Sequence, residues 1–295
     1  MVERDDSDFM SHGLRCAGWL CLPKGVSKPP VVVMAHGFAA ERTFGLMAFA
    51  EVFVRQGIAA FVFDYRCFGD SQGEPRNLVS PRRHLEDWAA ALSHVRGLKA
   101  IDTARVALWG TSFSGGHVIV TAARDRRISA VVAQVPFVGG LASAGTLGPA
   151  YILKALAAGL RDAVRMATLQ PPYTVPIVGD PQTFAVMNTP GSREGYLSLV
   201  PKGSSWQNQC PARILLSVLA YRPDAYARKV ACPALVIAAE KDSLIPVAAV
   251  ERMVRKMPKA TLVRLPVGHF DVYTGETFRD AVEREAAFLK TALRS

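Results

Sequence analysis

The sequence predicts an α/β fold with a mostly parallel central sheet, flanking helices and a helical insertion. Short apolar runs rich in β-branched residues recur along the chain, as expected for strands covered on both faces. Helical patterns alternate with these runs, and this alternation is typical of βαβ units with right-handed crossovers. With 295 residues, half of them hydrophobic, the chain can bury a core of that size.

The expected elements follow one another in a regular order. The first thirty residues have β character, and Pro29-Pro30 leads into the first wholly apolar run. The next helix ends before Gly57, which stands at a C-cap position. The expected strands cover residues 31–35, 58–63, 105–109, 128–134, 234–239 and 261–265, and the expected helices cover about 45–56, 81–97, 116–124, 247–257 and 277–293, with a turn over 110–116.

The alternation breaks between residues 137 and 226. This stretch is helical, is interrupted by Gly and Pro, and has no clear strand; its main expected helix covers 151–170. We therefore expect a core domain formed by residues 1–136 and 227–295. Residues 137–226 are expected to form a helical cap over the sheet.

The strongest chemical signal lies between a predicted strand and a predicted helix, in the segment 110–116 (Gly-Thr-Ser-Phe-Ser-Gly-Gly). A serine on such a sharp turn has strained backbone geometry, and its hydroxyl projects from the sheet. Strand and helix approach closely there, so small residues are needed two places before and after it. Gly110 and Ser114 fill those places around Ser112, although glycine is usual at the second. The rival register makes Ser114 the nucleophile; we favour Ser112 because the strand ends at Trp109-Gly110.

A nucleophilic serine needs a histidine base and a carboxylate that orients it. Asp242 follows the predicted strand 234–239, at the carboxyl edge where open α/β sheets place their sites. Glu240 is a weaker rival for this role. His269 follows the next strand and is the only histidine after residue 117. The order serine, aspartate, histidine, each after its own strand, predicts a catalytic triad of Ser112, Asp242 and His269.

The oxyanion formed during acyl transfer needs two backbone N–H donors. Phe113, the residue after the nucleophile, is expected to supply one. The other is expected from the loop after the first apolar strand, where we favour Phe38 over Ala39. His36, in the same loop, is expected to be held by hydrogen bonds behind it in a structural role.

Five loops of the sequence resemble those of one known superfamily. They are His36-Gly37-Phe38, the segment 64–73 (Asp-Tyr-Arg-Cys-Phe-Gly-Asp-Ser-Gln-Gly), the segment 110–116, Glu240-Lys241-Asp242 and Gly268-His269-Phe270-Asp271. Together they resemble the α/β-hydrolase superfamily, and within it the dienelactone-hydrolase-like and X-prolyl-peptidase-like (S15-type) esterases. The likeness covers residues 10–136 and 230–290, with Cys67 where glycine is common. In the second loop, Asp64, Arg66 and Asp70 are expected to bond backbone groups of a tight turn.

The resemblance implies a serine hydrolase with the α/β-hydrolase fold, acting on a small-molecule acyl ester, thioester or lactone through an acyl-enzyme. It implies no metal and no organic cofactor. A thioesterase or acyltransferase acting on a polyketide-like acyl chain would use the same residues, and a non-catalytic ligand-binding module would share the fold. Six cap residues are expected either to line the pocket or to fill the cap's own core: Tyr151, Met166, Tyr173, Phe184, Met187 and Trp206.

Composition argues against several other classes of protein. The net charge is +10, but the basic residues are spread out and lack interleaved aromatics, so no nucleic-acid partner is expected. No apolar run approaches the roughly 20 residues that span a bilayer, so no stable membrane insertion is expected. The N-terminus has no leader pattern, which favours a cytoplasmic location. The five scattered cysteines favour free thiols, and the sequence leaves a homodimer open.

Overall fold

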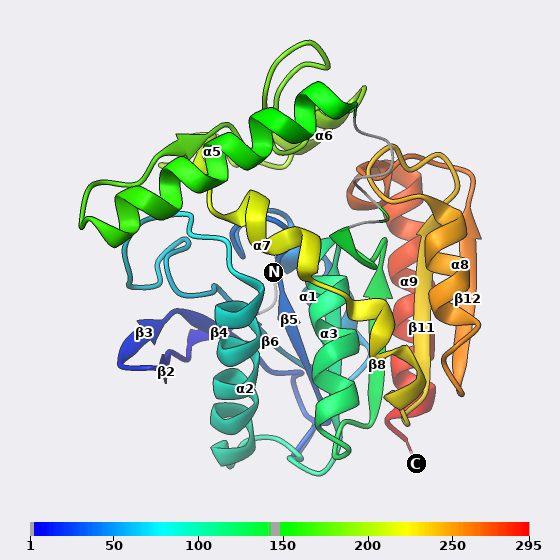
Figure 1. The fold of residues 1–295 in the computed structure, drawn as a ribbon. Coiled ribbons are helices and arrows are strands. Elements are labelled where there is room, and N and C mark those ends of the chain that lie inside the picture. Colours follow the sequence, from blue (N-terminus) through cyan, green and yellow to red (C-terminus); the bar gives the residue numbers. More distant parts are fainter. Residues whose placement is uncertain (1–2, 141, 143–147, 295) are drawn as a thin grey trace.

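An eight-stranded sheet forms the centre of the computed structural model, which describes residues 3–140, 142 and 148–294 (Figure 1). The strand order is β1-β4-β6-β5-β7-β8-β11-β12. Only the pairings β1–β4 and β4–β6 are antiparallel; the strands from β6 to β12 run parallel. The bounds are β1 (Arg4–Asp6), β4 (Gly18–Cys21), β5 (Val31–Ala35), β6 (Ala59–Phe63), β7 (Val106–Thr111), β8 (Ala130–Gln134), β11 (Ala234–Ala239) and β12 (Ala260–Leu265). The predicted α/β-hydrolase fold is confirmed.

Helices cover both faces of this sheet. On one face lie α2 (Pro81–Gly97), α3 (Phe113–Arg124) and α8 (Val247–Val254), and on the other α1 (Leu46–Arg55) and α9 (Gly275–Ala292). Successive strand residues point to opposite faces, so β5 sends Val31 and Val33 into one core and Val32 and Met34 into the other. This double burial explains why the strands are apolar throughout.

One expected turn is wrong. The turn expected over 110–116 shrinks to a single residue, because β7 continues to Thr111 and α3 already begins at Phe113. Of the glycines that suggested a longer turn, Gly110 belongs to β7, and Gly115 and Gly116 belong to α3. A Cβ at Gly115 would lie 2.8 Å from Pro136 Cα, so this glycine lets the helix pass close to the chain that follows β8.

Smaller differences lie elsewhere. The helix expected over 247–257 ends at Val254, and the helix expected over 151–170 is α5 (Pro149–Ala167). A hairpin of β2 (Phe9–Ser11) and β3 (Leu14–Cys16) stands apart from the main sheet.

Between β8 and β11 the described chain first lies beyond one end of the sheet and then returns alongside α3 (Figure 1). We call its described residues from 148 to 229 the cap segment. It contains α5, α6 (Ser192–Leu197), α7 (Ile214–Ala220) and two short 3₁₀ turns (Pro223–Ala225 and Ala227–Lys229). It also contains a pair of short strands, β9 (Thr174–Val175) and β10 (Cys210–Pro211). The sequence did not predict this pair, because a strand of two residues is too short to show alternating apolar and polar residues.

A buried carboxylate holds the cap segment together. Asp162 of α5 is fully buried and accepts hydrogen bonds from the backbone N–H groups of Tyr173 and Arg213, both at 2.9 Å. It also pairs with the Arg213 guanidinium at 2.6 Å. These bonds join α5 to the segment that leads into α7. None of the described helices is both long enough and apolar enough to cross a membrane.

A second buried carboxyl lies in the core between α9 and the sheet. Glu285 is fully buried, and its Oε2 accepts a hydrogen bond from Trp109 Nε1 at 2.9 Å. Burial raises the pKa of Glu285 to about 8, because the apolar surroundings disfavour the charged form. The carboxyl is therefore mostly protonated at neutral pH.

Glu285→Gln should flatten the pH dependence of folding stability. The unfolded state loses this proton near pH 4.5 and the folded state near pH 8, so stability falls by ~1.4 kcal/mol per pH unit between them. The glutamine keeps an acceptor for Trp109 and cannot ionise. The free energy of unfolding, measured with denaturant, should therefore fall less steeply in the variant than in the wild type as pH rises through this window. The exposed Glu283→Gln is the control; an equal slope in wild type and Glu285→Gln would contradict the assignment.

Candidate active site

Ser112 occupies the junction between β7 and α3. Its φ is +53°, in the left-handed region that non-glycine residues avoid, so the backbone turns sharply there. A Cβ at Gly110 would overlap the carbonyl oxygen of Ser114, which explains the glycine two places before the serine. The strained turn predicted from the sequence is present.

A continuous chain of hydrogen bonds joins Ser112 to His269 and Asp242. His269 Nε2 lies 3.0 Å from Ser112 Oγ, and His269 Nδ1 lies 2.6 Å from Asp242 Oδ2. An ionised carboxylate can only accept, so Nδ1–H donates to Asp242 and Nε2 is left to accept from the serine hydroxyl. Asp242 is fixed in turn, because its Oδ1 accepts from the N–H groups of Leu244 and Ile245 at 2.8 and 2.9 Å.

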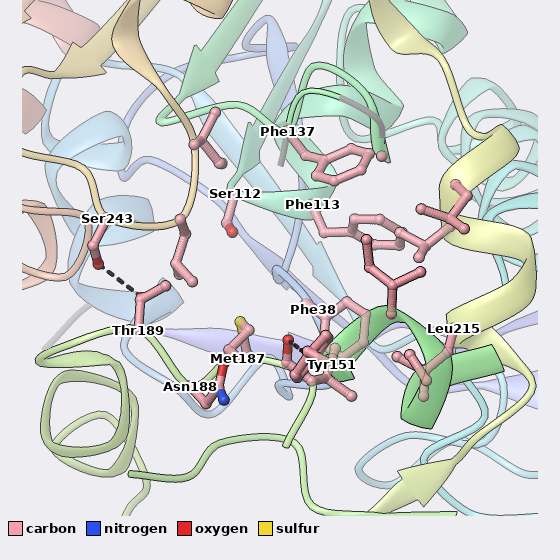
Figure 2. A pocket seen from close by; sticks show the side chains of 18 of the residues that line it. Phe38, Ser112, Phe113, Phe137, Tyr151, Met187, Asn188, Thr189, Leu215 and Ser243 are labelled. Atoms are coloured by element: carbon pink, nitrogen blue, oxygen red, sulfur yellow. Dashed lines mark hydrogen bonds between the residues drawn. The ribbon is translucent and has the colours of Figure 1, made fainter. Parts of the chain in front are cut away.

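An apolar cavity of about 150 Å³ opens beside Ser112 (Figure 2). Its walls come from the core, from the loop after β11 and from the cap segment. A smaller cavity of about 30 Å³ lies on the His269 side, and the two share Phe38, Ser112 and Met187. The larger is lined by Phe38, Ser112, Phe113, Phe137, Gly140, Tyr151, Ile152, Ala155, Leu156, Val186, Met187, Asn188, Thr189, Leu215, Val218, Leu219, Ser243, Leu244 and Ile245.

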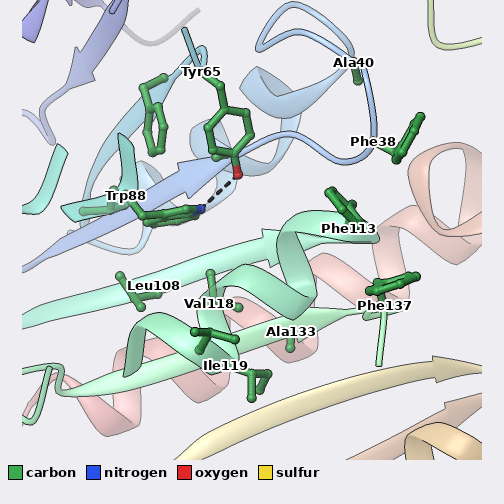
Figure 3. Packing of buried hydrophobic residues seen from close by; sticks show 14 of the residues in the cluster. Phe38, Ala40, Tyr65, Trp88, Leu108, Phe113, Val118, Ile119, Ala133 and Phe137 are labelled. Atoms are coloured by element: carbon green, nitrogen blue, oxygen red, sulfur yellow. Dashed lines mark hydrogen bonds between the residues drawn. The ribbon is translucent and has the colours of Figure 1, made fainter. Parts of the chain in front are cut away.

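The two rival residues lie elsewhere. Ser114 is fully buried, and its Oγ lies 2.8 Å from Tyr65 OH. Tyr65 OH also accepts a hydrogen bond from Trp88 Nε1 of α2 in the core (Figure 3). Glu240 pairs with Arg264 at 3.4 Å on the surface. The structure thus brings Asp242 and His269 to Ser112, and neither rival joins them.

The loop after β5 passes directly against Ser112. A Cβ at Gly37 would lie 3.1 Å from Ser112 Cβ, so only glycine fits without displacement. The N–H groups of Phe38, Ala39 and Phe113 find no acceptor within the part of the chain that the structure describes. Of Phe38 and Ala39, only Phe38 borders the two cavities.

Two cap residues hold this loop: Trp206, which was expected in the pocket or in the cap's own core, and Tyr196, which was not predicted. Tyr196 OH donates to Phe38 O, and Trp206 Nε1 donates to Ala39 O, each at 2.9 Å. Ala39 has a φ of +52°, so the loop is itself strained. Long-range contacts of this kind have no local pattern that a sequence could reveal.

His36 lies behind the loop, where the sequence places it. The ring is buried, and Nδ1 is 3.0 Å from the carbonyl oxygen of Gly37. Tyr65 packs against it edge-on, with 4.8 Å between ring centroids. Burial lowers the pKa of His36, so the ring stays neutral and Nδ1–H can donate to that carbonyl.

Asp64 and Arg66 of the loop 64–73 form buried ion pairs, whereas the sequence predicts bonds to backbone groups of the turn; one such bond is present, from Asp70 N–H to Asp64 Oδ2 at 3.4 Å. Asp64 pairs with the Arg42 guanidinium and accepts the Arg42 backbone N–H at 2.6 Å. Arg42 also reaches Asp70 at 2.8 Å. Arg66 pairs with Asp87 of α2 at 2.5 Å. The partners lie in other elements, so spacing within the loop could not identify them.

The six cap residues singled out from the sequence divide between several roles. Tyr151 and Met187 line the large cavity, and Phe184 packs on Tyr151. Met166 is half-exposed on the surface, and Tyr173 lies under the guanidinium of Arg161. The walls formed by α7 and by residues 243–245 were not predicted. All five cysteines are free.

This chain matches several curated proteins over nearly its whole length. It is 39% identical to the quorum-quenching protein AidA of Acinetobacter baumannii over 285 residues, covering 97% of this chain and 94% of that protein. It is 27% identical to the polyketide transferase af380 of Aspergillus fumigatus, covering 99% of both. It is 25% identical to a thiohydrolase of Eupenicillium brefeldianum, covering 98% of this chain and 95% of that protein.

Solved structures agree on the fold. DcsB in complex with its substrate analogue superposes with a TM-score of 0.88 at 23% identity, covering 99% of this chain and all of that one. The α/β hydrolase GrgF of a Penicillium species gives 0.86 at 24% identity, with both chains covered in full. Residues 27–267 match the family described as serine aminopeptidase, S33, a different branch from the esterases that the loops resemble. The chain therefore belongs to the S33 family of the α/β-hydrolase superfamily.

Proposed function

We propose that this protein is a serine hydrolase that cleaves a carboxylic ester, thioester or lactone with an apolar acyl group. The observation that carries the proposal is His269, which bridges Ser112 and Asp242 at the wall of an apolar cavity. A hydroxyl next to a neutral imidazole acceptor, with a carboxylate behind it, is the arrangement that activates a serine for attack on a carbonyl.

The reaction proceeds in two acyl transfers. His269 Nε2 takes the hydroxyl proton as Ser112 Oγ attacks the substrate carbonyl carbon. Phe38 and Phe113 donate their N–H groups to the oxyanion, and Asp242 stabilises the charged imidazole. The intermediate collapses to an acyl-serine, and His269 gives its proton to the departing alcohol or thiol. A water then attacks the acyl-serine with His269 as base, which releases the acid and restores Ser112.

The positions of the two cavities favour one of them for the acyl chain of the substrate and the other for its leaving group. The leaving group must receive a proton from His269, which borders the small cavity and not the large one. The acyl chain therefore takes the cavity of about 150 Å³ and a small leaving group takes the one of about 30 Å³. The large cavity is lined mainly by apolar side chains, which favours a hydrocarbon acyl chain.

A peptide substrate fits these cavities less well, despite the family's description. Recognition of a free α-amino group calls for a carboxylate, and none of the described residues lining either cavity is Asp or Glu. The relatives named thiohydrolase and polyketide transferase favour acyl substrates instead. Transfer of the acyl group to an acceptor other than water is the second candidate, because it needs the same acyl-serine.

Ser112→Ala should abolish labelling by a fluorophosphonate probe and lower p-nitrophenyl ester turnover by at least about a thousandfold. The nucleophile is lost, while the fold is retained because the side chain makes no core contact that alanine cannot replace. Ser114→Ala is the matched control and should still be labelled. Labelling that persists in Ser112→Ala and disappears in Ser114→Ala would reverse the assignment.

Gly37→Ala should lower kcat/KM about tenfold to a hundredfold with little change in thermal stability. The added methyl pushes the loop away from Ser112 and misplaces the Phe38 N–H. Gly97→Ala is the control, because nothing lies within 4 Å of a Cβ there. Unchanged kinetics in Gly37→Ala would remove this loop from the mechanism.

Leu215→Phe should shift the preferred ester toward shorter acyl chains. The larger ring occupies part of the acyl cavity at a wall that lies well apart from Ser112 in Figure 2. The longest esters accepted by the wild type should lose roughly tenfold in kcat/KM, while acetate esters change little. Ser217→Phe adds the same ring on the exposed side of α7 and should leave the profile unchanged. A uniform loss across all chain lengths would contradict the acyl assignment.

A further inference from the structure

The exposed apolar side chains of this protein are concentrated on one helix. Among the described residues, all the large hydrophobic side chains that are exposed belong to α5 or the turn after it, except Met10 and Val26. Leu153, Val164 and Leu160 are 68%, 61% and 58% exposed. A contiguous apolar surface of this kind usually marks an interaction site.

The three most exposed of these side chains within α5 form one stripe along the helix. Leu153, Leu160 and Val164 are spaced by seven and four residues, so they fall on one side of the helix, which we call the outer face. Asp162, on the opposite side, holds the helix to Arg213. Figure 1 shows α5 across the outer end of the molecule, beyond the sheet and α7.

Basic residues border the outer face along one edge. Lys154, Arg161 and Arg165 follow each other at helical spacing, next to the apolar stripe. The only acidic residue of α5 is Asp162, which is buried in its pair with Arg213. The exposed surface of α5 thus combines aliphatic side chains and three cations with no carboxylate.

We propose that α5 docks on an anionic phospholipid surface. The outer face would enter the boundary between headgroups and acyl chains, and Lys154, Arg161 and Arg165 would meet the lipid phosphates. An apolar stripe flanked by cations is the pattern of helices that lie in the membrane interface without crossing it. This site lies outside the proposed active centre and does not depend on its chemistry.

The charges favour lipid over a second copy of the chain. In an antiparallel pair of α5 helices, the two basic edges would lie on the same side and repel each other. In a parallel pair the cations would find no carboxylate, because α5 exposes none. The outer face also lacks the aromatic side chains that are enriched at protein interfaces, which argues against an acidic protein.

Docking through α5 would also bring the acyl cavity close to the lipid surface, from which a substrate could enter. Ile152 and Leu156, at the other edge of the stripe, line the acyl cavity. A docked helix would therefore place a wall of that cavity at the bilayer, where apolar acyl compounds collect. Only this consequence rests on the proposed function.

Flotation with phosphatidylcholine vesicles, with and without phosphatidylglycerol, tests the proposal on the full chain. The wild type should bind only the anionic vesicles, and more weakly as salt rises. Leu153→Ser with Leu160→Ser should weaken binding by roughly tenfold or more, and Lys154→Gln by about fivefold. The controls Met10→Ser and Lys99→Gln alter exposed side chains off α5 and should bind as the wild type does.

Three outcomes would overturn the proposal. They are a wild type that stays unbound, leucine variants that bind like the wild type, and a dimer by light scattering that needs Leu153 and Leu160 while vesicles are ignored. The third outcome would assign the face to a second copy. Because Ser112→Ala leaves α5 intact, it should bind vesicles fully, so the failure of docking and the failure of the hydrolase proposal are distinguishable.

Discussion

The close approach of β7 and α3 at Ser112 is the constraint on which the rest of the site depends. A helix can start one residue after a strand only if the residue between them takes a left-handed conformation and its neighbours leave room. Gly110 gives that room on the strand side, and Gly115 lets α3 pass Pro136. Ser112 is thus positioned by packed backbone, and the loops that carry His269 and Asp242 bring their side chains to it.

The loop opposite Ser112 is positioned differently, by bonds from the cap segment. Tyr196 and Trp206 bind the carbonyl groups of Phe38 and Ala39, and α5 joins the path to α7 through Asp162. The cap segment therefore does two things at once, because it walls the cavities and holds the backbone that faces the serine. A change in the cap that reshapes the cavities also acts on this loop; under the proposed function, this would couple substrate specificity to the geometry around Ser112.

The sequence predicted those features of the fold and the site that depend on the pattern of neighbouring residues. Buried strands read as continuous apolar runs, and the order of Ser112, Asp242 and His269 follows from each standing after its own strand. The cap segment could not be predicted in the same way, because β9 and β10 are too short to show alternation. In the core domain, the partners Arg42 of Asp64 and Asp87 of Arg66 come from separate elements, so the sequence did not reveal these ion pairs either. The cavity wall from α7 was missed for a similar reason, because only the folded chain brings that helix to the cavity beside Ser112.

Helix α5 shows the limit of reading burial from hydrophobicity. Leucines and alanines occupy much of the circumference of α5, and this composition usually indicates a helix enclosed by protein. One edge does face the cavity, through Ile152 and Leu156, but the outer face carries Leu153 and Leu160 into solvent. A helix with two apolar surfaces needs two apolar neighbours, and the described chain supplies one of them. No described residue supplies the second, and the cations beside the stripe favour a surface that is apolar within and negatively charged at its rim.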